Sequence, residues 1–238
     1  NLNYLGGLKN LASIYAELRM PEEAGNSLNE LEVLVGDFYG KDSKEYGDMM
    51  AEMGVTYYEL NMIRKAENSF RTYLDINKEK NDDPDLVYGF VLTKYSMVLN
   101  ARGKYLEAER NRIRGIQILE SFLGKEHPAV IVEYSNLGTL YYNTGKLDQS
   151  QDLLLSLQKS AANVFGEKNS DYTKIIQSLA DVYIEKGNYG EAEILLEKIQ
   201  EINSEILKGN DPYNAEIFNS FGNLYWQMGR FDDADAEF

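Results

Sequence analysis

The sequence of 238 residues contains no cysteine and only one histidine. Without cysteine, the chain can form no disulfide, no thiolate metal site and no cysteine nucleophile. A single histidine argues against a histidine-rich metal centre and against a histidine-based catalytic triad. We therefore expect no catalytic residue, no cofactor and no metal site in this chain, and we do not expect it to be an enzyme.

Basic residues are also scarce, since 24 lysines and arginines face 39 acidic residues and leave a net charge of −15. Phosphate backbones and anionic membranes repel a polyanion, so neither nucleic acid nor a membrane is an expected partner. No run of about 18 apolar residues is present that could span a bilayer. The N-terminus shows no signal-peptide pattern, and we expect a cytoplasmic protein.

One pattern of small and apolar residues recurs along the whole chain at a fixed step of 42 residues. Its six copies are 11–15, 53–57, 95–99, 137–141, 179–183 and 221–225. A small residue returns at the same step further on, at Ala24, Ala66, Ala108, Ser150, Ala192 and Ala234. Six copies without insertion or deletion cannot reasonably arise by chance, so the repeat determines the expected architecture.

Each copy has the periodicity of two helices. In the first helix, apolar residues recur at i, i+3 and i+7, as in Tyr134, Leu137 and Tyr141, which places them on one face. Glycine follows this helix in four copies, at the position where a C-cap adopts the left-handed conformation. Asn61 and Arg19 occupy that position in two earlier copies, and Arg19 is the less suited of the two. The apolar positions of the second helices are Leu28, Leu31, Phe70, Tyr73, Leu154, Leu157, Leu196 and Ile199.

The expected fold class is all-α, because no strand-like alternation or hairpin signal occurs. A helix pair cannot bury its apolar face alone, so stacked pairs should form one continuous array over residues 1–238. The repeats are expected at about 1–42, 43–84, 85–126, 127–168, 169–210 and 211–238. The last repeat is incomplete and Phe238 falls at an apolar packing position, so we expect this end to be truncated or incompletely ordered.

The residues of the repeat resemble the tetratricopeptide repeat (TPR), as in Gly138–Tyr141 followed by Gly145, and Ala180–Tyr183 followed by Gly187. The step of 42 residues, against about 34 in the common form, resembles the kinesin-light-chain-like subclass, and so does the Gly-Lys-Glu-His-Pro segment at 124–128. The resemblance implies a right-handed α-solenoid of antiparallel helix pairs, a TPR superhelix. Arg112 and Gly115 depart from the pattern, because both occupy packing positions of a second helix.

The resemblance also implies that the first helices line a concave groove, and the helical angle gives the residues opposite the buried face. The candidate binding residues are Phe90, Thr93, Met97, Asn100, Val132, Ser135, Thr139, Tyr142, Asn143, Gln177, Asp181, Asn219, Asn223 and Trp226. Amides suit the backbone of an extended peptide, and exposed apolar side chains offer anchors. The ends of the groove are mostly acidic, through Glu17, Asp48, Glu59, Asp181, Glu185 and Glu216, opposed by Lys9 and Lys174. We hypothesise a partner peptide or protein segment with an apolar centre and basic flanks; alternatively, these are ordinary solvent-facing residues and the partner docks elsewhere.

Several single features have more ordinary explanations. His127 has no second metal ligand nearby in the sequence, which favours a role near a helix start. The basic cluster from Arg102 to Arg114 interleaves with acidic residues, which favours an ion-paired surface over nucleic-acid binding. Trp226 is either a ligand anchor on the groove or a residue covered by a further C-terminal neighbour.

The preferred function is a non-enzymatic protein–protein interaction scaffold. The alternative is the sensor or regulatory part of a larger enzyme, such as a caspase-like peptidase, a kinase or a nucleotide-binding switch, whose catalytic domain lies outside this chain. The resemblance alone also suggests a motor cargo adaptor. The sequence leaves the identity of the partner and the oligomeric state open.

Overall fold

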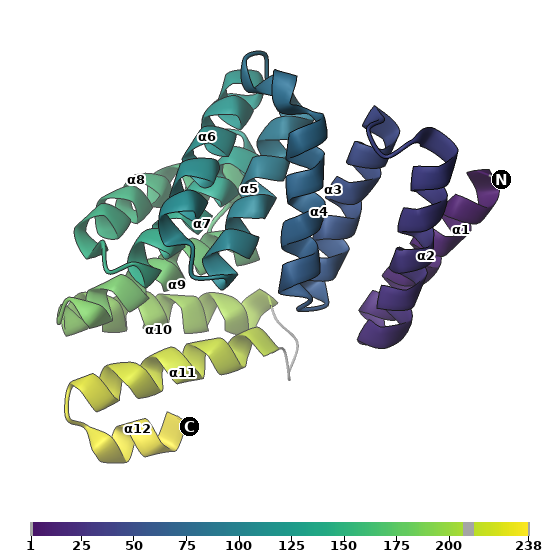
Figure 1. The fold of residues 1–238 in the computed structure, drawn as a ribbon. Coiled ribbons are helices and arrows are strands. Elements are labelled where there is room, and N and C mark those ends of the chain that lie inside the picture. Colours follow the sequence, from purple (N-terminus) through teal and green to yellow (C-terminus); the bar gives the residue numbers. More distant parts are fainter. Residues whose placement is uncertain (1, 207–211, 238) are drawn as a thin grey trace. The chain divides into compact units, whose positions relative to one another are not determined.

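The computed structural model describes residues 2–206 and 212–237, and in these ranges the chain is all-α, with no strand. The helices are α1 (Leu2–Glu17), α2 (Pro21–Tyr39), α3 (Lys44–Glu59), α4 (Ile63–Ile76), the short 3-10 helix η1 (Lys78–Asn81), α5 (Leu86–Ala101), α6 (Tyr105–Leu123), α7 (Pro128–Asn143), α8 (Leu147–Phe165), α9 (Ser170–Glu185), α10 (Tyr189–Ile206), α11 (Pro212–Gln227) and α12 (Phe231–Glu237) (Figure 1). Phe238, on which the expectation of an incomplete end rests, lies outside the described residues, as does the segment 207–211.

The step of 42 residues is preserved in the structure, because the first helices begin at positions 2, 44, 86, 128, 170 and 212. Each first helix ends in a Schellman motif, whose two backbone bonds satisfy the last carbonyls. After α7, for example, the Lys146 N–H donates to the Tyr141 carbonyl at 2.9 Å, and the Gly145 N–H donates to the Tyr142 carbonyl at 3.0 Å. The predicted glycine C-caps are confirmed, with φ of 73° at Gly103, 72° at Gly145, 77° at Gly187 and 74° at Gly229.

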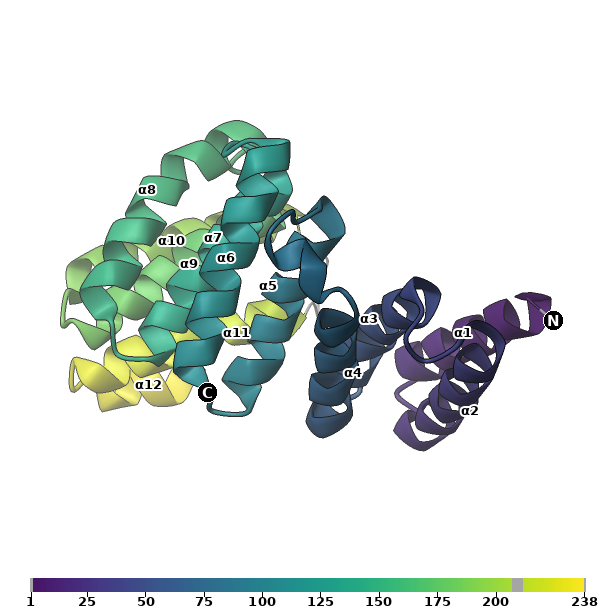
Figure 2. The same cartoon turned by 45° about the horizontal axis from the view of Figure 1, so that its top comes forward.

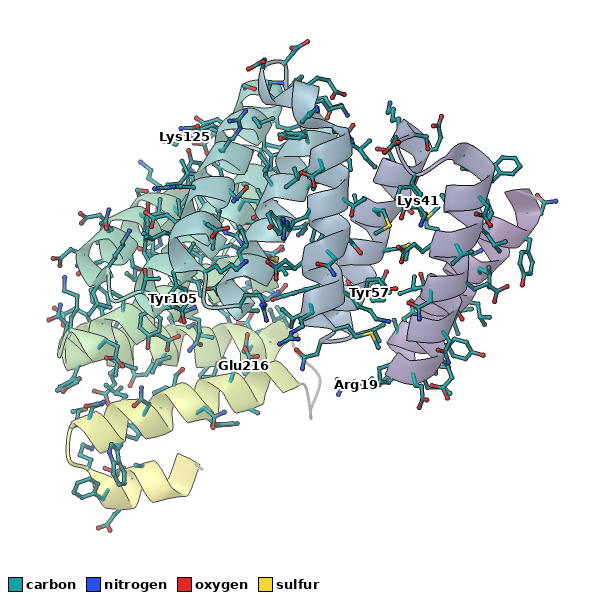
Figure 3. The ribbon with its side chains drawn as sticks, in the orientation of Figure 1. Arg19, Lys41, Tyr57, Tyr105, Lys125 and Glu216 are labelled. Atoms are coloured by element: carbon teal, nitrogen blue, oxygen red, sulfur yellow. The ribbon has the colours of Figure 1, made fainter. Side chains whose placement is uncertain are left out.

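The turn between α1 and α2 holds Arg19 in this left-handed conformation, with φ of 55° (Figure 3). Replacing Arg19 by glycine is expected to raise the free energy of unfolding by about 0.5–1 kcal/mol, because glycine has no Cβ to clash in this conformation. Urea denaturation measures the change. Arg19→Ala is the control, since alanine keeps the Cβ; an equal gain in both variants would exclude backbone strain as the cause.

The chain divides into two compact units, Asn1–Leu119 and Glu120–Phe238, called here the N-terminal unit and the C-terminal unit. In the N-terminal unit, α1 contacts α2 and α3 contacts α4, while α2 also contacts α3 and α4 contacts α5. The C-terminal unit repeats this order from α7 to α12 (Figure 2). Successive first helices also touch, α1 with α3 and α3 with α5 in one unit, and α7 with α9 and α9 with α11 in the other. Within each unit, the first helices therefore form a shared surface.

Small residues and a stripe of large apolar residues build the interior of both units. The recurring small residues of the second helices are all fully buried: Ala24, Ala66, Ala108, Ser150, Ala192 and Ala234. The predicted apolar positions are also buried, each at 5% exposure or less: Leu28, Leu31, Phe70, Tyr73, Leu154, Leu157, Leu196 and Ile199. Leu11 of α1, by contrast, is 38% exposed, so the buried face predicted for this helix is narrower than expected.

The two departures from the repeat pattern lie on the buried side of α6. Arg112 is only 4% exposed, and its Nη2 donates to the Thr93 carbonyl at 3.5 Å. Gly115 faces α5 so closely that a Cβ at this position would lie 2.8 Å from the Gly89 carbonyl oxygen and 2.6 Å from Thr93 Cγ2. Gly115 therefore permits a close approach of α5 and α6 that a larger residue would prevent.

Candidate functional site

The N-terminal unit contains an apolar cavity between α3 and α5, called here the N-terminal groove. Its volume is about 530 Å³, and its apolar lining consists of Ala51, Val55, Phe70, Val87, Phe90 and Val91. A smaller cavity of about 160 Å³ shares Val55 and Phe70 with it and extends the lining to Tyr58 and Met97. Phe70 comes from α4 and is 1% exposed, so it closes the groove from the side of the second helix. The groove can accept apolar side chains of a partner.

Charged residues of both signs surround the N-terminal groove: Lys44, Asp48, Glu52, Lys80, Asp85 and Lys94. Lys80 Nζ lies 2.7 Å from Asp85 Oδ2, and Asp85 Oδ1 accepts from the Tyr88 N–H at 2.8 Å, which caps α5. Burial acts to raise the pKa of Asp85, but the bonds from Lys80 and Tyr88 outweigh it and lower this pKa. Glu52 pairs with Lys9 of α1. The positive and negative side chains around the N-terminal groove thus compensate much of each other's charge.

The C-terminal unit gathers three carboxylates, Asp181 and Glu185 of α9 and Glu216 of α11, called here the carboxylate cluster. Asp181 Oδ1 accepts a hydrogen bond from the Ser220 hydroxyl at 3.1 Å and one from Gln177 Nε2 at 3.4 Å. Burial raises the pKa of Asp181 to about 6, although the two hydrogen bonds act to lower it. The negative charges of Glu185 and Glu216 also act to raise this pKa.

Tyr142 of α7 brings a third first helix to the carboxylate cluster. Burial raises the pKa of its phenol to about 12, and the charges of Asp181 and Glu185 add to this effect. Its hydroxyl hydrogen-bonds to Glu185, which raises the pKa further because the bond favours the protonated phenol. Tyr142 thus links α7 to the carboxylate cluster of α9 and α11.

A smaller polar cavity of about 220 Å³ lies between α7 and α9 in the same unit. Val132, Ser135 and Thr139 line it from α7, and Lys174 and Ser178 line it from α9. The hydroxyls of Thr139 and Ser178 lie 3.5 Å apart. Three of the candidate binding residues therefore border one cavity, whereas in the N-terminal unit Phe90 borders the N-terminal groove and Met97 borders the smaller cavity beside it.

Most other candidate residues are accessible but border no described cavity. Asn143, Asn219 and Trp226 are exposed, and Asn100 and Asn223 are half-buried. Trp226 is 57% exposed and makes an edge contact with Phe231, with ring centroids 5.0 Å apart.

The expectation that Thr93 and Gln177 face solvent is wrong. Thr93 has no exposed surface, because α6 covers it where Gly115 allows close contact. Gln177 is 8% exposed, and its Nε2 donates to Ser220 of the next first helix at 2.5 Å. The helical angle gives only the direction in which a side chain leaves its own helix. It therefore does not predict which side chains a neighbouring helix covers.

Several residues that build these surfaces were not predicted from the sequence. Val87 and Val91 line the N-terminal groove beside Phe90. Their i, i+3 and i+4 spacing could have revealed them, because such residues share a helix face. Phe70 belongs to a second helix, and only first helices were considered for the groove. Ser220 lies beside the face of its first helix that is opposite the predicted buried face. Helical spacing alone therefore indicated neither residue.

The basic cluster and His127 have structural roles in agreement with the ordinary explanations. Arg102 Nε lies 3.0 Å and Lys104 Nζ lies 2.6 Å from the carboxylate of Glu67, which is 6% exposed. The Lys104 bond is the main cause that lowers the pKa of Glu67. His127 caps α7, because its Nδ1 accepts from the Ala129 N–H at 3.2 Å.

Among the residues that the structure describes, no group of three or more histidine, aspartate or glutamate side chains lies together in a way that could hold a metal ion. No helix in the same residues has the length and apolar character needed to cross a membrane.

Comparison with known proteins identifies the family. The sequence matches the Tetratricopeptide repeat family over residues 90–161 and 172–238, which is more than half of the chain. It is 22% identical over 181 residues to kinesin light chain-related protein 2 of Arabidopsis thaliana, and 24% identical over 182 residues to kinesin light chain-related protein 3 of the same plant. Each alignment covers 76% of this chain but only 27% and 28% of the relatives, so the chain spans about a quarter of their length.

Solved structures share the fold. The kinesin light chain array of nearly identical TPR-like repeats from Podosopora anserina aligns with a TM-score of 0.73 at 17% identity, covering 88% of this chain and 99% of that one. BtubC (BKLC) from P. vanneervenii aligns with a TM-score of 0.67 at 16% identity over 98% of this chain and 87% of its own. Cut9–Hcn1, an APC/C hetero-tetramer, aligns with a TM-score of 0.62 at 14% identity over 95% and 37% of the two chains. The expected all-α solenoid fold of antiparallel helix pairs is thus confirmed, and the chain belongs to the tetratricopeptide repeat family, with repeats of the kinesin-light-chain kind.

Proposed function

We propose that this chain is a non-enzymatic protein-interaction scaffold that binds a peptide or protein segment on the first helices of its repeats. Tetratricopeptide arrays use the extended surface of stacked hairpins for binding. The observation that carries the proposal is the N-terminal groove, where Ala51, Val55 and Phe90, three first-helix positions opposite the buried face, border a single cavity. One relative of the same fold is itself part of a hetero-tetramer, Cut9–Hcn1, which is consistent with an assembly role.

The chemistry of the groove favours an apolar anchor on the partner. Phe90 is half-buried and offers aromatic surface, and Val87 is 53% exposed at the edge of the groove. A partner side chain that covers these groups removes apolar surface from water, which drives association. Opposite charges on the rim, such as Asp48 and Lys44, can then orient polar groups that flank the anchor.

The test begins with a displayed library of random peptides that is selected on the whole chain. The affinity of the selected peptides is then measured by calorimetry for Val87→Asp and Val55→Asp. Each variant places a carboxylate in the apolar groove, so we expect affinity to fall about tenfold or more, as the desolvation cost of a buried charge requires.

Leu106→Asp is the matched control. Leu106 is 69% exposed on α6 of the same unit and borders no described cavity, so the same chemical change there should leave affinity within about twofold. The proposal fails if no peptide is enriched, or if selected peptides bind both groove variants as tightly as the unchanged chain.

A further inference from the structure

We propose that the polar cavity bordered by Ser135 and Thr139 of α7 and by Lys174 and Ser178 of α9, called here the hydroxyl cavity, is a subsite for a primary-amide side chain of the bound partner, that of glutamine or asparagine. This inference rests on the proposed function, because it assigns the chemistry of one residue of the bound segment. The cavity lies within the C-terminal unit, where α7 and α9 are neighbouring first helices (Figure 2).

The shape of the hydroxyl cavity suits one side chain. On α7 the lining residues stand at i, i+3, i+4 and i+7 counted from Val132, and on α9 they have the same spacing counted from Asp171. Residues with this spacing share one face of a helix, so two matching faces border the cavity. Its volume of about 220 Å³ is below the roughly 300–1,000 Å³ of pockets that enclose a whole drug-sized ligand.

The two hydroxyl oxygens between the helices act as acceptors. The Ser178 hydroxyl donates to the Lys174 carbonyl at 3.1 Å, and the Thr139 hydroxyl donates to the Ser135 carbonyl at 3.3 Å. A hydroxyl has one hydrogen and two lone pairs, so both oxygens can still accept a hydrogen bond. They lie 3.5 Å apart, one on each helix. The cavity therefore offers a pair of adjacent acceptors.

Lys174 supplies a donor beside this pair of acceptors. Its Nζ lies 3.5 Å from Asp171 Oδ1, and its side chain is 58% exposed. An ammonium has three N–H donors, so contact with one carboxylate leaves donors for a ligand. Asp171 and Lys174 are the charged residues of the lining, and their opposite charges compensate each other.

A primary amide matches these groups better than a charged side chain does. Its NH₂ group carries two donors for the oxygens of Thr139 and Ser178, and its carbonyl oxygen can accept from Lys174. A carboxylate has no donor and is repelled by Asp171, whereas an ammonium or a guanidinium is repelled by Lys174. A backbone amide has a single N–H and cannot serve both oxygens.

The absence of cysteine allows a direct test, because one introduced cysteine gives a single attachment point for probes. Asn143→Cys places a thiol at an exposed position of α7, one turn beyond Thr139. The whole chain is equilibrated in a thiol buffer with equal amounts of short disulfides of equal length that end in a primary amide, a methyl ester, a carboxylate or an ammonium. Mass spectrometry then measures the fraction of each adduct.

We expect the primary-amide adduct to exceed the methyl-ester adduct about fivefold or more, because the ester keeps the carbonyl but lacks both donors. Ser156→Cys is the matched control, since Ser156 is exposed on α8 of the same unit and borders no described cavity. There the ratio of amide to ester should be near one, and the charged probes report the effect of the net charge of −15. Equal ratios at the two cysteines would overturn the proposal.

Thr139→Val, combined with Asn143→Cys, removes one acceptor and keeps the shape of the side chain. The ratio of amide to ester should fall about threefold to tenfold, as the loss of one hydrogen bond requires. Thr72→Val is the matched control, because the Thr72 hydroxyl also donates to a carbonyl four residues before it, at 3.0 Å, but borders no described cavity. A ratio that is unchanged in Thr139→Val, or that falls equally in both variants, contradicts the proposal.

Lys174→Met distinguishes an amide subsite from an anion subsite. Methionine removes the charge, so we expect the ammonium adduct to increase several-fold while the ratio of amide to ester, both of which have a carbonyl, stays the same. If the carboxylate adduct instead dominates at Asn143→Cys and is lost in Lys174→Met, the cavity binds anions and the proposal is wrong.

The subsite and the proposed function can fail separately. If selected peptides bind and lose affinity in the groove variants, but the tethered amide is not preferred, only the amide subsite is wrong. If the tethered amide is preferred but no peptide is enriched on the chain, the peptide-binding scaffold is wrong, and the hydroxyl cavity takes the primary amide of a small molecule.

Discussion

Replacing Phe70 by alanine is expected to lower the free energy of unfolding by about 3–5 kcal/mol, because a large buried aromatic ring leaves a cavity. Phe70 is 1% exposed, and its ring lies 6.1 Å from that of Tyr95 on α5. On α3, a Cβ at Gly54 would lie 3.0 Å from the Phe70 ring. The ring thus connects α4 with both first helices of the N-terminal groove. Urea denaturation followed by circular dichroism measures the change.

The control for this prediction comes from the repeat itself. Leu28, Leu154 and Leu196 occupy the position of Phe70 in other repeats, each at 2% exposure or less. Phe70→Leu should therefore cost only about 1–1.5 kcal/mol, since leucine fills most of the space. Equal losses in Phe70→Ala and Phe70→Leu would show that the site requires an aromatic ring rather than apolar volume.

Replacing Gly115 by alanine is expected to cost about 1–3 kcal/mol, as overpacking of a closely packed interior does. The added Cβ would meet the Gly89 carbonyl oxygen at 2.8 Å, and a backbone atom in the middle of α5 cannot move aside as a side chain can. We also expect the protection of α5 amides against hydrogen exchange to decrease, since relief of the clash requires α5 and α6 to separate.

Gly7→Ala is the matched control for Gly115→Ala. Gly7 also lies inside a helix, α1, but a Cβ there would meet nothing within 4 Å. Alanine is the better helix former, so this variant should gain about 0.5–1 kcal/mol. A loss of similar size in both variants would mean that helix geometry, rather than contact with α5, determines the effect.

The helical hairpins were predictable because their signals are local and repeat six times. The 42-residue step, the glycine after four of the six first helices and the buried small residues all follow from spacing and backbone conformation. Arg19 and Asn61 adopt the left-handed conformation although neither is glycine, with φ of 55° and 57°. The turn geometry shared by all six repeats therefore holds these two residues in a conformation that residues with a Cβ normally disfavour.

The candidate site was less predictable because it depends on contacts between repeats. Thr93 and Gln177 lie on the helix face opposite the predicted buried face, yet a neighbouring helix covers each of them. In the case of Thr93, the cause is Gly115, whose missing side chain brings α6 close. Phe70 could not be found from its own helix, since it reaches the N-terminal groove from α4.

The position of Trp226 makes the C-terminal hairpin optically distinct. It is the only tryptophan among 238 residues, whereas eighteen tyrosines are distributed over the repeats. Its ring is 57% exposed and touches Phe231 across the turn from α11 to α12. Indole emission therefore reports fraying of this one hairpin, while circular dichroism reports the loss of all helices. A difference between the two unfolding midpoints would measure how strongly the last repeat is coupled to its neighbours, without any added label.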